Sequence, residues 1–151
     1  MKYLLYAGIL LGVLLLPERG TDVGKLIPVE VVAISESDGM VSVGTDTGDV
    51  GRGQTLEAAI TDLKASARGI IYLDTAEYLL LETGTEHHLN TVERHLKPGV
   101  HLCYAREGID LEAIADFLSV HRPDVTLRTV LDSNSIPTIS EENGRFHLIE
   151  K

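Results

Sequence analysis

The pattern of apolar and polar positions divides the chain into one long apolar run and a longer body of short, punctuated segments. The run covers residues 3–16, follows Lys2 and ends at Pro17. No stripe of polar residues at helical spacing interrupts it, which argues against an amphipathic helix that covers a core. A basic start followed by 14 apolar positions is typical of an export signal, and it is short for a full membrane span of ~20 residues. We therefore expect residues 1–20 to be a signal peptide or an uncleaved membrane anchor.

Two outcomes stay open for this segment. No small-x-small cleavage site follows Leu16, which favours an uncleaved anchor with the remaining chain on the outer face of the membrane. Cleavage would instead release the chain as a secreted protein. No cysteine lies near the run to carry a lipid, and the single cysteine, Cys103, lies in an apolar stretch where a buried packing role is expected.

Residues 21–151 alternate between strand-like and helix-like patterns. Thr55 is a good N-cap, and the apolar residues of 56–66 follow at i, i+3, i+4 and i+7, which predicts a helix. A Ser-Asp-Gly turn at 37–39 predicts a hairpin. The expected strands are 27–34, 40–43, 70–74, 77–82, 100–105, 125–131, 136–140 and 146–149. The other expected helices begin at Thr85 and Asp110 and end before Pro98 and Pro123.

Strands and helices alternate only through the middle of the chain, and hairpins are expected at both ends. This order predicts an α/β or α+β fold: a single domain, residues 21–151, with a mixed sheet and about three helices. Residues 45–53, rich in Gly and Asp, are expected to be a loop.

The charge and the aromatic content exclude one class of partner. The formal net charge is -10, from 23 acidic and 13 basic residues, and only 5% of the residues are aromatic, with no Trp. A phosphate backbone would be repelled by such a surface, and single-stranded nucleic acid would find few stacking platforms. We therefore expect no nucleic-acid partner.

One glycine-rich segment imitates a phosphate-binding loop. Residues 48–55 have the spacing G-x-x-x-x-G-K-[ST], but Gln54 replaces the Lys. A turn with a helix cap explains the same residues. As an alternative function, a small anion or ligand could bind at Gly51, Arg52, Gly53, Gln54 and Thr55, with the helix N-terminus behind it.

The histidines offer a further alternative, a hydrolase or metal enzyme. His88 and His95 share a helix face, but a spacing of i, i+7 puts them ~10 Å apart, too far for one metal ion. His87 and Glu86 could join a site with His101 or His121. No catalytic constellation is recognisable, because there is no G-x-S-x-G motif and Cys103 is expected inside a strand. We therefore assign no catalytic residue, no metal ligand and no cofactor from the sequence.

Several short motifs, taken in order, resemble the N-terminal domain of the spore germination receptor C-subunit family, Ger(x)C. Residues 23–34 (VGKLIPVEVVAI) stand where the family has its first strand, and residues 53–59 (GQTLEAA) match its G-x-T-L-x-E-A helix start. Residues 70–82 (IIYLDTAEYLLLE) resemble the pair of strands that follows. The resemblance covers residues 23–121, and the chain looks like a shortened relative without the lipidated Cys.

This resemblance implies a non-catalytic, extracytoplasmic protein on the cell membrane or the spore inner membrane. Members of the family act beside membrane-embedded receptor subunits that sense nutrients. Together with the apolar segment, it leads us to expect a membrane-tethered interaction domain linked to spore germination or sporulation, with membrane protein subunits as partners. No functional residue is carried over, because the resemblance contains no catalytic motif.

Overall fold

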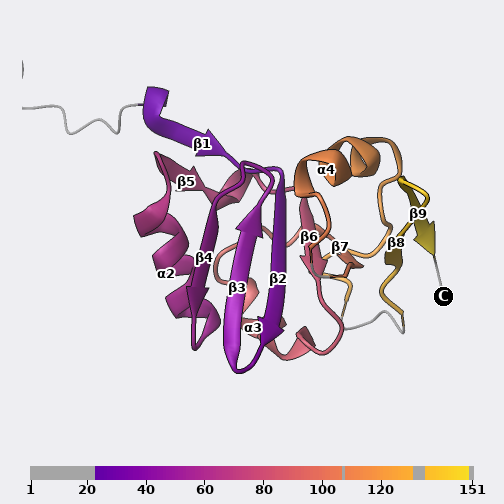
Figure 1. The fold of residues 1–151 in the computed structure, drawn as a ribbon, viewed down its shortest axis with the longest axis horizontal. Coiled ribbons are helices and arrows are strands. Elements are labelled where there is room, and N and C mark those ends of the chain that lie inside the picture. The colour runs from indigo at the N-terminus through magenta and orange to yellow at the C-terminus, as the bar shows by residue number, and fades with distance from the viewer. Residues whose placement is uncertain (1–22, 107, 131–134, 150–151) are drawn as a thin grey trace, which may run out of the picture.

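A seven-stranded mixed sheet forms the centre of the fold (Figure 1). The computed structural model describes residues 23–106, 108–130 and 135–149, so the expected export segment, residues 1–20, lies outside the described residues. In spatial order the strands are β4 (Val50–Gly53), β3 (Met40–Thr45), β2 (Val31–Ser37), β6 (Tyr78–Leu81), β7 (His101–Tyr104), β8 (Thr138–Glu142) and β9 (Arg145–Ile149). The expected fold class, a mixed sheet with about three helices and a hairpin near each end, is confirmed for these residues.

The middle of the sheet is parallel and its margins are antiparallel. β6 lies between β2 and β7 and runs in the same direction as both, whereas β2–β3–β4 and β8–β9 are antiparallel. All four residues of β6 are buried, which is the pattern of a strand covered on both faces. The hairpin β2–β3 turns at Asp38 and Gly39, whose φ angles of 52° and 73° suit the tight two-residue turn that the sequence predicts.

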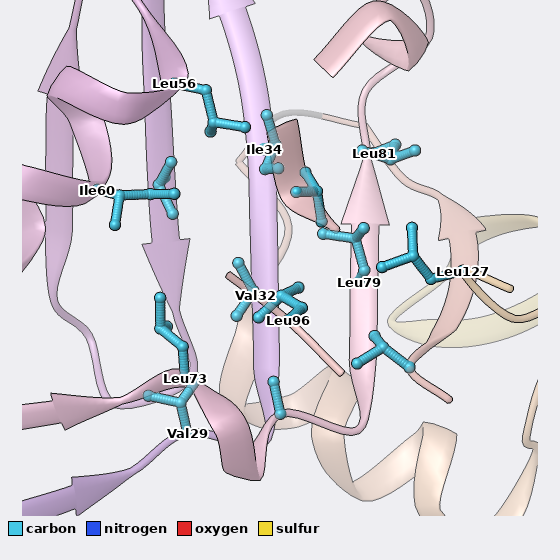
Figure 2. Close-up of a cluster of buried hydrophobic side chains, with 14 of the residues drawn as sticks. Val29, Val32, Ile34, Leu56, Ile60, Leu73, Leu79, Leu81, Leu96 and Leu127 are labelled. Carbon is cyan, nitrogen blue, oxygen red and sulfur yellow. The ribbon is translucent and has the colours of Figure 1, made fainter. Parts of the chain in front are cut away.

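Helices cover both faces of the sheet. On one face, Leu56 and Ile60 of α2 (Leu56–Ser66) point toward Val32 and Ile34 of β2 (Figure 2). α3 (Leu89–Val92) belongs to the same face through Val92. On the other face, α4 (Leu111–Val120) buries Ile114, Ala115 and Leu118 against a separate cluster that includes Tyr78, Leu80 and Cys103. The sheet therefore separates two apolar cores.

A second, two-stranded sheet lies beside α2 at the place where the chain enters the described region (Figure 1). Its parallel strands are β1 (Leu26–Pro28), which follows the 3-10 helix η1 (Val23–Lys25), and β5 (Ile70–Tyr72). Gly69 permits their close approach, because a Cβ there would lie only 2.6 Å from the carbonyl oxygen of Lys25. The chain then passes through the 3-10 helix η2 (Leu73–Thr75) into β6.

Two of the expected strands are wrong in extent. Residues 27–34 form two strands rather than one, since the amides of Glu30 and Val31 bond the Asp46 carboxylate at 3.0 Å instead of continuing one ladder. Residues 70–74 are a strand only as far as Tyr72, because η2 begins at Leu73. The expected loop 45–53 is also wrong in part, since it contains β4.

Two further elements are shorter than expected. The helix expected to start at Thr85 consists of the 3-10 helix η3 (Glu86–His88) followed by the short α3. The strand expected at 125–131 is reduced, in the described residues, to an isolated bridge between Thr126 and His101. The reason is local: the Thr126 amide bonds the Thr129 hydroxyl at 2.9 Å, and this side-chain bond closes a turn. Among the described residues, no helix has the length and hydrophobicity needed to cross a membrane.

Candidate functional site

The carboxyl ends of the parallel strands bring together side chains from distant parts of the sequence. Glu36 lies near the end of β2, and η3, which carries His87 and His88, lies in the connection that follows β6. Because β2 and β6 run parallel in neighbouring positions, their carboxyl ends meet at one edge of the sheet. This edge is the place where open α/β sheets usually carry their ligand sites.

Both imidazoles at this edge point at one carboxylate oxygen. Nε2 of His88 lies 3.1 Å from Oε2 of Glu36, and Nε2 of His87 lies 3.2 Å from the same atom. The two rings are neighbours, with centroids 4.0 Å apart. The ligand atoms of the three residues all lie within 4.8 Å of one another, and in the described part of the chain they form the one group of three possible metal ligands. We call this group the His-Glu cluster.

Backbone groups and a second carboxylate lie around the His-Glu cluster. Nδ1 of His87 lies 3.1 Å from the carbonyl oxygen of Gly84, which can only accept, so Nδ1 carries the proton. The amide of Glu36 donates to Oε2 of Glu82 at 3.3 Å. Buried Thr85 donates its hydroxyl to the Glu82 carbonyl oxygen at 2.7 Å and so fixes the turn that leads into η3.

Glu86, at the start of η3, is engaged by the neighbouring strand. The hydroxyl of Tyr104, the last residue of β7, donates to its Oε1 at 2.6 Å. This hydrogen bond is the main reason why the pKa of Glu86 is lowered. Burial, with a further contribution from Glu86, raises the pKa of Tyr104 to about 12. Glu86 therefore anchors η3 on β7.

The other histidines considered from the sequence lie apart from the His-Glu cluster. His95 pairs with Glu57 of α2 at 3.1 Å. Nδ1 of His101 lies 2.6 Å from the carbonyl oxygen of Pro123, and Nδ1 of His121 lies 3.2 Å from that of Phe117 in α4. Sequence reasoning missed Glu36, because it lies 52 positions before His88 and only the pairing of β2 with β6 joins them.

The structure gives the glycine-rich segment a packing role. A Cβ on Gly51 would lie 2.2 Å from the carbonyl oxygen of Ala59, and one on Gly53 would lie 2.7 Å from the amide nitrogen of the same residue, so both glycines let β4 lie directly on α2. The Arg52 amide donates to the Asp62 carboxylate at 2.9 Å. Thr55 caps α2 by accepting from the Ala58 amide.

The five residues of the expected anion loop lie in different structural settings, and anion binding there stays a prediction. Gly51 and Gly53 belong to the β3–β4 ladder, and exposed Gln54 lies between β4 and α2. The Arg52 side chain instead lines an open hollow of about 270 Å³ on the other face of the sheet, together with Arg106 and Glu82. Because both positive and negative side chains line this hollow, its charge does not favour one class of ligand.

Cys103 is a poor nucleophile in this position. Its free thiol is fully buried in β7, and burial raises its pKa to about 12. A thiol needs the thiolate form and access to act as a nucleophile or metal ligand. The packing role expected from the sequence fits this environment.

The outer face of the two-stranded sheet is apolar and exposed. Ile70 and Tyr72 of β5 are 45% and 44% exposed, and in the parallel register they lie beside Leu26 and Pro28 of β1. The alternate residue of β5, Ile71, is buried in the core, so the four side chains share the opposite face. We call this surface the β1–β5 face.

Comparison of the chain with protein-family models, with curated proteins and with solved structures finds no match.

Proposed function

We propose that this protein is a non-enzymatic interaction domain, held at the outer face of a membrane by residues 3–16, which docks the β1–β5 face on membrane protein subunits. The single observation that carries the proposal is the exposed apolar face on the first strand of the described chain, ten residues after the apolar run in the sequence. Its partners would be receptor subunits, and its role would be in spore germination or sporulation, as the resemblance to the Ger(x)C family implies.

Chain length supports the proposal. Leu26, the first residue of β1, is ten positions after Leu16, where the apolar run ends. Ten residues span at most ~35 Å when fully extended, so a tether at residues 3–16 would keep the β1–β5 face within that distance of the bilayer surface. Partners embedded in the membrane are therefore the proteins that this face would meet.

The chemistry of the surface supports a protein partner. Apolar side chains on neighbouring strands form a patch that water solvates poorly, and such patches on soluble domains commonly mark interaction sites. Tyr72 adds a side chain that is enriched at interfaces. A tether raises the local concentration of the domain, so a modest affinity would be sufficient.

Fractionation with surface proteolysis of intact cells tests the tether. The full-length chain should sediment with membranes and be cleaved by protease added from outside. Recovery of the full-length chain in the soluble cytoplasmic fraction would overturn the proposal.

Site-specific photo-crosslinking in the same cells tests the docking face. A photoreactive residue at Tyr72 should form a defined crosslink to an integral membrane protein, and Ile70→Asp should abolish that crosslink. The matched control is a photoreactive residue at Val120, which is also apolar and 76% exposed but lies at the end of α4. Equal crosslinks from both positions would contradict a specific face.

A further inference from the structure

We propose that Glu36, His87 and His88 form a binding site for a divalent transition-metal ion of the Zn²⁺ class. The inference goes beyond the interaction role, because it concerns a different edge of the molecule and does not depend on the tether. The His-Glu cluster supplies two imidazole nitrogens and one carboxylate oxygen, a donor set that suits Zn²⁺ and related metals rather than Mg²⁺ or Ca²⁺.

The spacing of the three donor atoms fits one ion. Two ligands that are each ~2.1 Å from a tetrahedral metal lie about 3.4 Å from one another. Nε2 of His88 and of His87 lie 3.1 Å and 3.2 Å from Oε2 of Glu36, and no pair in the group exceeds 4.8 Å. Both His–Glu distances are therefore within a few tenths of an ångström of the tetrahedral spacing.

The hydrogen bonds of His87 leave the correct nitrogen for a metal. Its Nδ1 donates to the carbonyl oxygen of Gly84, so in the neutral ring Nε2 carries the lone pair. That nitrogen faces Oε2 of Glu36 at 3.2 Å, so a cation held between the two atoms would be bound by both. Histidine ligands of metals characteristically donate their other ring nitrogen to a carbonyl or carboxylate, as His87 does here.

One divalent ion can hold all three groups together. The two imidazole rings have centroids 4.0 Å apart, and both direct Nε2 at Oε2 of Glu36. A Zn²⁺ ion would balance the carboxylate and both lone pairs at once, with the rings uncharged. The neighbouring Glu82, which accepts the Glu36 amide, adds negative potential that favours a cation.

The position of the cluster leaves room for a further ligand. The His87 side chain is 59% exposed and that of Glu36 is 33% exposed, so the remaining coordination position faces water. The His88 side chain is only 13% exposed, which holds one ligand in a fixed orientation. The ion would join the end of β2 to the connection between β6 and β7.

A second His-Glu pair in the same molecule provides an internal control. His95 lies 3.1 Å from Glu57 at the surface, much as His88 does from Glu36, and Arg94 completes that group instead of another imidazole. This pair has one nitrogen donor and a competing cation. It should therefore behave as an ordinary ion pair and not as a metal site.

Calorimetric titration of the full-length, untagged chain with Zn²⁺ after treatment with a chelator tests the proposal. The wild type should bind equimolar Zn²⁺ with a dissociation constant in the micromolar range or below. His87→Gln, at the most exposed ligand, and Glu36→Gln should each weaken binding by about 100-fold or more, since loss of even an outer-shell partner costs 10–100-fold. His95→Gln should leave the affinity unchanged.

Two checks keep the result interpretable. The metal-free variants should show the circular dichroism spectrum and urea midpoint of the wild type, which separates loss of a ligand from loss of the fold. Co²⁺ should give visible bands without thiolate charge transfer, because buried Cys103 lies outside the site. The proposal is overturned if the wild type does not bind equimolar Zn²⁺, or if His95→Gln weakens binding as much as His87→Gln does.

Discussion

Tyr104 donates its phenolic proton to Oε1 of Glu86 at 2.6 Å, and this bond joins the end of β7 to the start of η3. The next two residues of η3 are His87 and His88. β7, which follows η3 in the sequence, thus fixes the helix that carries His87 and His88, two of the three residues of the His-Glu cluster. A carboxylate acceptor and a short distance make this a charge-assisted hydrogen bond, which is stronger than a neutral one.

Removal of the Tyr104 hydroxyl should destabilise the domain in a pH-dependent way. We expect Tyr104→Phe to lower the free energy of unfolding by about 1 kcal/mol at neutral pH, since the pair is partly exposed. The hydrogen bond lowers the pKa of Glu86 below its usual 4.5, so its contribution is present above that pH and is lost as the pH falls through the lowered value. Urea denaturation of both proteins across this range measures the difference.

The difference in unfolding free energy between the two proteins should also change at high pH. The pKa of Tyr104 is raised from 10.0 to about 12, so the contribution is complete below pH 10.0 and is lost as the pH rises toward 12. The difference between wild type and Tyr104→Phe should therefore be largest between pH 4.5 and pH 10.0. A difference that does not vary with pH would show that the hydroxyl acts through packing alone.

A methyl group at Gly51 should disrupt the contact between β4 and α2. The new Cβ would lie 2.2 Å from the carbonyl oxygen of Ala59 and 2.3 Å from the amide nitrogen of Leu63, and neither backbone atom can rotate away. We expect Gly51→Ala to cost about 3 kcal/mol or more, measured by urea denaturation. Gly99→Ala is the matched control, because no atom lies within 4 Å of its added Cβ. Equal midpoints for the two variants would refute this packing role.

Cys103 should resist thiol reagents as long as the protein is folded. The side chain is 0% exposed, and burial raises its pKa to about 12, so little thiolate forms at neutral pH and no reagent reaches it. Absorbance with a disulfide reagent should show no rapid reaction of the native protein and equimolar reaction in denaturant. A fast reaction under native conditions would indicate that β7 opens locally.

Local signals predicted the elements whose causes are local. Helix α2 has the expected bounds, because the cap at Thr55 and the apolar spacing of residues 56–66 both lie within one segment. The turn at Asp38 and Gly39 was predictable for the same reason. The parallel pairing of β2 with β6 has no such local signature, since α2 and three strands separate them in the sequence.

The elements that were missed depend on contacts between distant residues. β4 was expected to be a loop, because Gly51 and Gly53 have low strand propensity, but α2 requires the absence of side chains at both positions. Residues 125–131 are an exception: they were expected to be a strand, but the hydroxyls of Thr126 and Thr129 bond each other's backbone amides and close a local turn. The His-Glu cluster could not be predicted either, because Glu36 is brought to the histidines only by the pairing of β2 with β6.

The attachment of β8 to β7 has a consequence for how the domain opens. Within the described residues these two strands share one registered pair, Tyr104 with Thr138, whereas β8 and β9 pair at five positions from Thr138 with Ile149 to Glu142 with Arg145. We therefore expect the last hairpin to separate as an intact unit, resisted by the burial of Ile139 and by the packing of Phe146 and Leu148 on the same core cluster. The domain should then have two levels of stability, with a C-terminal ribbon that detaches at lower free energy than the parallel centre unfolds.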